Sequence, residues 1–187
     1  MKLSKIKSVC RAERMVLMVE PMRAVEDGKA CNTISQWIGT RSAMYAADLG
    51  VTVDLGVLAN IWELTDKQED AMTWSHEEPE EWEWLARLPG MMSKDAPVIG
   101  IAKLGTAAFF RTPDGKAACV CMELMEPVVK QEGIHSYTVQ RMPGGKLWLL
   151  CYVDESLCAA ICCNTDWMRA KTAMRRAREL AEMQGTW

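Results

Sequence analysis

Two proline–glycine turns, each set between apolar runs, constrain the fold of this chain more than any other feature. They are Pro113-Asp114-Gly115 and Pro143-Gly144-Gly145. Proline presets the first torsion of a turn, and glycine accepts the positive φ needed to leave it, so each pattern predicts a β-hairpin. The runs expected as strands are Val98–Leu104, Thr106–Arg111, Ala117–Leu124, Tyr137–Met142, Leu147–Val153 and Leu157–Cys163. We expect them to form one antiparallel sheet.

The first half of the chain predicts a helix followed by a small meander. Apolar residues at helical spacing among lysines favour a helix near the start, and a capping aspartate, Asp54, favours a second one. Pro21 is expected to end the first strand, and the Glu26–Lys29 segment to form a turn. The expected elements are a helix over Met1–Val9, strands over Met15–Val19, Ala30–Ile38 and Ala43–Ala46, and a short helix over Leu55–Leu64.

The last segment predicts a closing helix. Asn164 or Thr165 can cap it, apolar residues recur at helical spacing, and Gly185 stops it. We expect its apolar stripe to pack on the sheet. The sequence therefore predicts one α+β domain over residues 1–187, with an N-terminal helix, a short central helix and a C-terminal helix on an antiparallel sheet.

Length and composition describe an ordinary globular protein. The chain has 187 residues, 49% of them hydrophobic and 25% charged, and a formal net charge of −3. A secretory signal pattern and an apolar run long enough to span a bilayer are both missing, so we expect a cytoplasmic protein without a membrane partner. The eight cysteines show no regular spacing and are expected to be reduced thiols.

An acidic segment containing tryptophans, residues 63–90, is the most unusual stretch of composition. Between Glu63 and Glu83 nine acids face the single base Lys67, and Trp74, Trp82 and Trp84 lie among them. A solvated surface explains the charges, but the tryptophans need something to pack on. Docking onto the rest of this chain and docking onto a partner protein both remain open.

Motifs for catalysis are missing from the sequence. It contains no phosphate-cradling glycine loop, no zinc helix and no C-x-x-C pair, and its two histidines, His76 and His135, stand alone. His135 at a strand entrance is more typical of a structural residue than of a general base. We therefore expect a protein that is not an enzyme and that uses no metal or cofactor.

The residue types that stand out suit binding. Arginines at predicted strand ends can form forked hydrogen bonds to phosphate or carboxylate, and aromatic rings nearby can stack on a base. Core packing is the alternative explanation for each aromatic residue. The candidate ligand-binding residues are Trp37, Arg41, Tyr45, Arg111, Tyr137 and Arg141.

One stretch resembles a known family. Gln36-Trp37-Ile38-Gly39-Thr40, followed by Ala43-Met44-Tyr45, is similar to a Q-W-I-G-x-G-x-A-x-Y pattern in small proteins of phages and prophages of gut Firmicutes, with Arg41 where the pattern has glycine. The lysine-rich start of the chain is also similar. Such proteins resemble phage anti-defence sponges, which bind a nucleotide-derived immune signal. The resemblance implies a cyclic oligonucleotide or cyclic ADP-ribose type of ligand, bound without turnover by a homo-oligomer.

Three interpretations compete at this point. The first is the nucleotide sponge, with the three arginines on phosphates and Trp37 or Tyr45 on a base. The second is a protein-interaction module whose acidic tryptophan segment inhibits a host defence protein. The third is a nucleic-acid binder that uses a basic C-terminal helix, and we rank it last because the chain is net negative and has no groove-reading motif.

Overall fold

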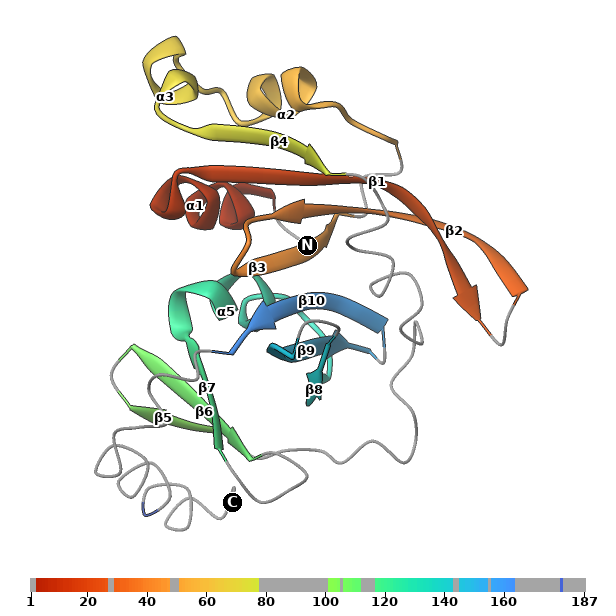
Figure 1. The fold of residues 1–187 in the computed structure, drawn as a ribbon, viewed down its shortest axis with the longest axis vertical. Helices are drawn as coiled ribbons and strands as arrows, with labels where there is room; N and C mark the ends of the chain where they lie inside the picture. The colour runs from red at the N-terminus through yellow and green to blue at the C-terminus, as the bar shows by residue number, and fades with distance from the viewer. Residues whose placement is uncertain are drawn as a thin grey trace. The chain divides into compact units, whose positions relative to one another are not determined.

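The structure is a computed structural model, and it shows an α+β fold. It describes residues 3–26, 29–47, 51–77, 101–104, 106–111, 117–142, 145–154, 156–163 and 179. The chain divides into two compact units, residues 1–91 and residues 92–187. Each unit contains its own strands and at least one helix (Figure 1). We describe each unit by itself.

The first unit contains helices and four strands, which are paired in the order β4-β1-β2-β3. Its elements are α1 (Leu3–Glu13), β1 (Met15–Glu26), β2 (Lys29–Gly39), β3 (Ala43–Ala47), α2 (Leu55–Ile61), α3 (Asp66–Asp70) and β4 (Thr73–Glu77). The predicted N-terminal helix, the first three strands and the short central helix are confirmed.

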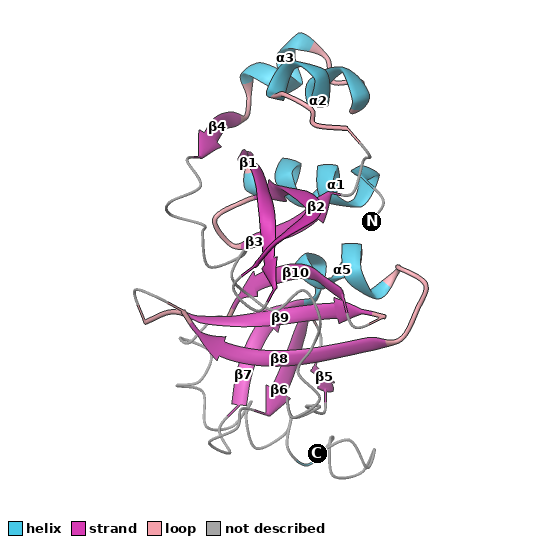
Figure 2. Ribbon diagram, turned by 90° about the vertical axis from the view of Figure 1, so that its right-hand side faces the viewer, coloured by secondary structure: helices cyan, strands magenta, loops and turns pink. Residues whose placement is uncertain are grey.

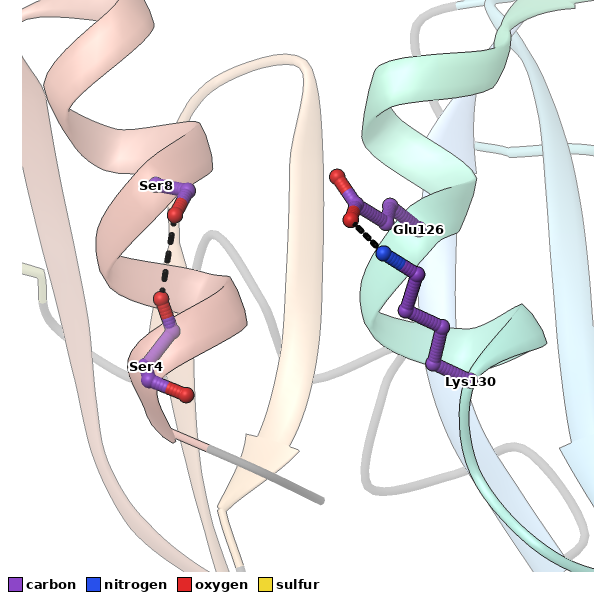
Figure 3. Close-up of polar contacts among 4 residues, drawn as sticks. All are labelled: Ser4, Ser8, Glu126 and Lys130. Carbon is purple, nitrogen blue, oxygen red and sulfur yellow. Dashed lines mark hydrogen bonds and ion pairs between the residues drawn. The ribbon is translucent and has the colours of Figure 1, made fainter.

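The N-terminal helix forms because one of its faces is apolar. Ile6, Val9 and Cys10 of α1 are buried, while lysines occupy its other faces. The Ser8 hydroxyl donates to the Ser4 carbonyl oxygen one turn earlier at 3.1 Å (Figure 3). Lys7 Nζ donates to the Trp62 carbonyl oxygen at the end of α2, so the two helices are joined directly.

The first strand does not end at Pro21, contrary to the sequence-based expectation. It continues to Glu26, and its pairing with β2 shifts register between Val19 and Met22. Proline has no N–H to give to a ladder, and a register shift allows a strand to pass such a residue. Glu26 then pairs with Lys29, which confirms the predicted reversal between them.

The sheet of the first unit is not purely antiparallel. β4, which the sequence did not predict, pairs in parallel with β1, with Met15 beside Thr73 and Val16 beside Trp74. The chain between β3 and β4 contains α2 and α3, and a crossover with helices is what a parallel pair requires. Residues 63–77 of the acidic segment therefore form part of this unit, and Trp82 and Trp84 lie outside the described residues.

Within the second unit the strands pair in two separate sets of three, where the sequence predicted one sheet. The elements are β5 (Ile101–Leu104), β6 (Ala107–Arg111), β7 (Ala117–Cys121), α5 (Met122–Val129), β8 (His135–Arg141), β9 (Leu147–Val153) and β10 (Ser156–Cys162). β5-β6-β7 form one antiparallel sheet, and β10-β9-β8 pair antiparallel in another. Figure 2 shows the strands of these two sheets running across one another.

Helix α5 explains why the two hairpins do not share a sheet. The sequence predicted a strand from Ala117 to Leu124, but the strand ends at Cys121 and a helix begins at Met122. Met, Glu and Leu are good helix formers, so the chain leaves the sheet here. Lys130 forms an ion pair with Glu126 in the last turn of this helix (Figure 3). The strands on either side of both predicted turns pair as expected.

The predicted C-terminal helix lies outside the described residues, except for Glu179, which is helical. Among the described residues, no helix has the length and apolar character that crossing a bilayer requires. The seven cysteines whose side chains are described are all free thiols, as expected.

Candidate anion-binding site

The six candidate residues are divided between the two units. Trp37, Arg41 and Tyr45 belong to the first unit, and Tyr137 and Arg141 belong to the second. Arg111 ends β6 opposite Ala117, and its side chain is outside the description. The candidate site is therefore built from each unit separately.

Trp37 and Tyr45 lie on opposite faces of the first sheet. Trp37 pairs with Ala46 and Tyr45 pairs with Ile38 in the β2–β3 ladder. Paired residues share a face and adjacent residues alternate, so the two rings point away from each other. Both side chains are buried. In this arrangement they stabilise the sheet on its two sides and do not flank one ligand.

In the second unit, Tyr137 and Arg141 lie on the same face of β8. Tyr137 is half-buried against Phe110, with ring centroids 5.3 Å apart, and burial raises the pKa of its hydroxyl to about 12. Arg141 is exposed, and its Nη1 donates to the Gly145 carbonyl oxygen at 2.5 Å. This guanidinium is thus already used in part to hold the β8–β9 turn.

Arg41 lies in the tight turn between β2 and β3. Thr40 fixes this turn, because its N–H donates to the Ala43 carbonyl oxygen at 2.8 Å and its Oγ1 accepts from the N–H groups of Ser42 and Ala43. Thr40 is fully buried, whereas Arg41 is exposed. A rigid turn therefore presents the Arg41 guanidinium to solvent.

The end of α1 lies beside this turn. The Cys10 thiol donates to the Gly39 carbonyl oxygen at 3.5 Å, which places the last turn of α1 against the last residue of β2. The antiparallel register pairs Leu17 with Gly39, so the chain before Leu17 runs alongside the chain after Gly39. Arg11 and Arg14 are therefore brought to the same end of the sheet as Arg41.

Arg14 makes the sharp connection from α1 to β1. Its φ is 51°, in the left-handed region that side chains other than glycine seldom adopt, and its N–H donates to the Arg11 carbonyl oxygen at 3.3 Å. Its own carbonyl oxygen accepts from the Thr73 N–H at 2.9 Å, which ties it to β4. Hydrogen bonds of both its N–H and its carbonyl oxygen hold the Arg14 backbone in this conformation.

The three arginines are exposed, and their side chains have no partner among the described residues. Within the described residues no ion pair or side-chain hydrogen bond involves Arg11, Arg14 or Arg41. One acid, Glu13, lies among them, and it raises the pKa of the Cys10 thiol after the larger effect of burial. Three exposed guanidinium groups at one end of a sheet suit a ligand with several anionic oxygens.

Sequence reasoning missed Arg11 and Arg14 as candidates. Their stretch was interpreted only as the passage from helix to strand. Two features together could have found them. The chain turns sharply at Arg14 between α1 and β1. β2 then runs antiparallel to β1, so its end and the β2–β3 turn lie at the end of the sheet where β1 begins. That combination depends on the length of α1, which was predicted to end at Val9 and ends at Glu13.

His135, at the start of β8, contacts the backbone. The half-buried His135 donates from Nε2 to the Gln131 carbonyl oxygen at 2.8 Å. No three His, Cys, Asp or Glu side chains in the described part of the chain are arranged to hold a metal ion.

Comparison with protein-family models, with curated proteins and with solved structures found no match to this chain. The candidate site therefore depends on its own geometry.

Proposed function

We propose that this protein binds a nucleotide-derived immune signal through its phosphates and sequesters it without chemical change. The observation that supports this proposal is the arginine cluster, defined as Arg11, Arg14 and Arg41: three exposed guanidinium groups at one end of the first unit's strands, with no partner in the part of the chain that the structure describes. The resemblance of the chain to small phage proteins supports a role against host defence, with a cyclic oligonucleotide or cyclic ADP-ribose type of ligand.

The chemistry of arginine favours phosphate at this site. Each guanidinium is always charged and offers a planar fork of donors that matches two phosphate oxygens. Three such groups at one end of a sheet can divide the oxygens of a diphosphate or of a cyclic dinucleotide among them. Glu13 works against the same ligand, since its carboxylate would repel an anion.

The first experiment is a thermal-shift and calorimetric screen of the full chain. The ligands are cyclic dinucleotides, cyclic trinucleotides and ADP-ribose isomers, and each recovered ligand is checked by mass. Stabilisation with unchanged ligand is expected. A ligand recovered in altered form would overturn the claim of sequestration, and the absence of stabilisation across the panel would overturn the proposed ligand class.

Variants locate the site. Arg41→Ala and Arg11→Ala should each weaken binding about tenfold or more, because each removes a charge-assisted hydrogen bond. Glu13→Gln should strengthen binding, which a merely structural role of this region would not predict. Arg141→Ala is the matched control, an exposed arginine of the second unit. If Arg141→Ala abolishes binding and Arg41→Ala does not, the site is not at the end of α1.

A further inference from the structure

The surface formed by α2 and α3 is distinct from the arginine cluster in its chemistry. Val57 and Ile61 of α2 are 44% and 48% exposed, although Leu58, Ala59 and Trp62 beside them are buried. Residues four apart lie on one side of a helix, so the two exposed side chains form a short apolar stripe. The buried residues occupy the opposite side of the same helix.

Acidic residues follow this stripe along the chain. From Glu63 to Asp70 the carboxylates are Glu63, Asp66, Glu69 and Asp70, all exposed, against the one base Lys67, so the net charge of this stretch is −3. Among the described residues no cation is paired with any of these four carboxylates. Their mutual repulsion is therefore reduced by the nearby charge of Lys67, by solvent and by salt, without an ion pair among the described residues.

Contacts through Trp74 of β4 connect α3 to the end of α2. The rings of Trp62 and Trp74 lie 6.3 Å apart, and Trp74 Nε1 donates to the Glu69 carbonyl oxygen at 3.1 Å. Thr65 and Gln68 form a capping box at the start of α3. Trp74 of the acidic segment and Trp62 before it thus help to fix this surface, whose exposed groups are aliphatic and acidic.

We propose that the α2–α3 surface, defined as Val57 and Ile61 with the four carboxylates that follow them, binds a cationic amphipathic helix of a partner protein. The apolar stripe runs along a helix, so it matches aliphatic side chains spaced one turn apart on a second helix. The four carboxylates that follow the stripe along the chain match lysines or arginines on that helix. Exposed apolar side chains within a strongly charged surface are typical of such contacts.

The test uses a short leucine–lysine peptide that forms an amphipathic helix, and a scrambled peptide of identical composition that has no apolar face. Binding to the full chain is measured by fluorescence anisotropy over a range of salt concentrations. The amphipathic peptide should bind at least about tenfold more tightly than the scrambled one. Its affinity should also fall as salt rises. Equal binding of the two peptides would overturn the role of the stripe.

Variants in both halves of the surface complete the test. One variant removes the apolar stripe and carries Val57→Ser with Ile61→Ser. A second variant removes charge and carries Asp66→Asn, Glu69→Gln and Asp70→Asn. Each variant should bind the peptide about tenfold more weakly. The matched controls are Ile134→Ser and Glu132→Gln, exposed residues of the second unit, which should leave peptide binding unchanged. Size-exclusion chromatography tests whether the surface instead binds a second copy of this chain. A dimer that Val57→Ser with Ile61→Ser dissociates would show that the surface binds a second copy of this chain, and would overturn the proposal.

Discussion

The side-chain amide of Gln36 forms two hydrogen bonds with the backbone of Val53. Its Nε2 donates to the Val53 carbonyl oxygen at 2.7 Å, and its Oε1 accepts from the Val53 N–H at 3.1 Å. Both residues are buried, so this amide replaces the ladder partner that the backbone of Val53 lacks. The contact fixes the chain before α2 to β2.

Replacing Gln36 should destabilise the protein without changing the packing volume much. Gln36→Met keeps the length of the side chain but leaves the N–H and carbonyl of Val53 buried without partners, so we expect the free energy of unfolding to fall by about 2 kcal/mol. Urea denaturation measures it. Gln140→Met on β8 is the control, because Gln140 is exposed and should tolerate the change. Equal stability of the two variants would contradict this account of Gln36.

Gly39 should tolerate no side chain. A Cβ there would lie 2.0 Å from the Ala43 carbonyl oxygen and 2.9 Å from the Met44 Cα, and these backbone atoms cannot move without opening the β2–β3 turn. We expect Gly39→Ala to lower the free energy of unfolding by at least about 2 kcal/mol. Gly56→Ala on α2 has room, with its nearest atom 3.4 Å away, and should be neutral or stabilising by up to about 1 kcal/mol. Thermal denaturation of the two variants decides the comparison.

These two residues also show what the sequence could and could not predict. The stretch Gln36-Trp37-Ile38-Gly39-Thr40, which carries the family resemblance, performs structural tasks in the first unit. Gln36 binds the backbone, Gly39 permits a close approach, and Thr40 fixes a turn. None of these tasks depends on a ligand, so the stretch is informative about the fold. The ligand-binding interpretation of Trp37 and Tyr45 depended on ring exposure, which residue type does not determine.

Strands and hairpins were predictable where local turn chemistry fixes them. Gly145 has a φ of 82° and its N–H donates to the Met142 carbonyl oxygen, as the predicted turn requires. The parallel pairing of β4 and the division of the second unit into two sheets were not predictable, because both depend on contacts between distant segments. The arginine cluster depends on such contacts too. Arg41 was recognisable as a residue at a strand end, whereas its proximity to Arg11 and Arg14 depends on how α1 packs against β2.

Buried thiols should make this protein sensitive to alkaline pH. Burial raises the pKa of Cys10, Cys158 and Cys163 to about 12 from an ordinary value of 9.0. Below pH 9 the thiols are protonated in both the folded and the unfolded chain, so their contribution to stability is fully present. Between pH 9 and about 12 the unfolded thiols lose protons while the folded ones keep them. The free energy of unfolding should therefore fall by about 1.4 kcal/mol per pH unit for each such thiol.

Urea denaturation at several pH values from about 9.5 to about 11 measures this slope, a window above the ordinary thiol pKa of 9.0 and below the raised values. Cys158→Ala should reduce the slope by about 1.4 kcal/mol per pH unit, because one buried titrating group is lost. That reduction is separate from any uniform loss of stability caused by the smaller side chain. Ile134→Ala is the control: Ile134 is exposed and carries no titrating group, so its replacement should leave the slope unchanged. If Cys158→Ala keeps the wild-type slope, the Cys158 thiol ionises in the folded protein as readily as in the unfolded chain, and its burial does not protect it.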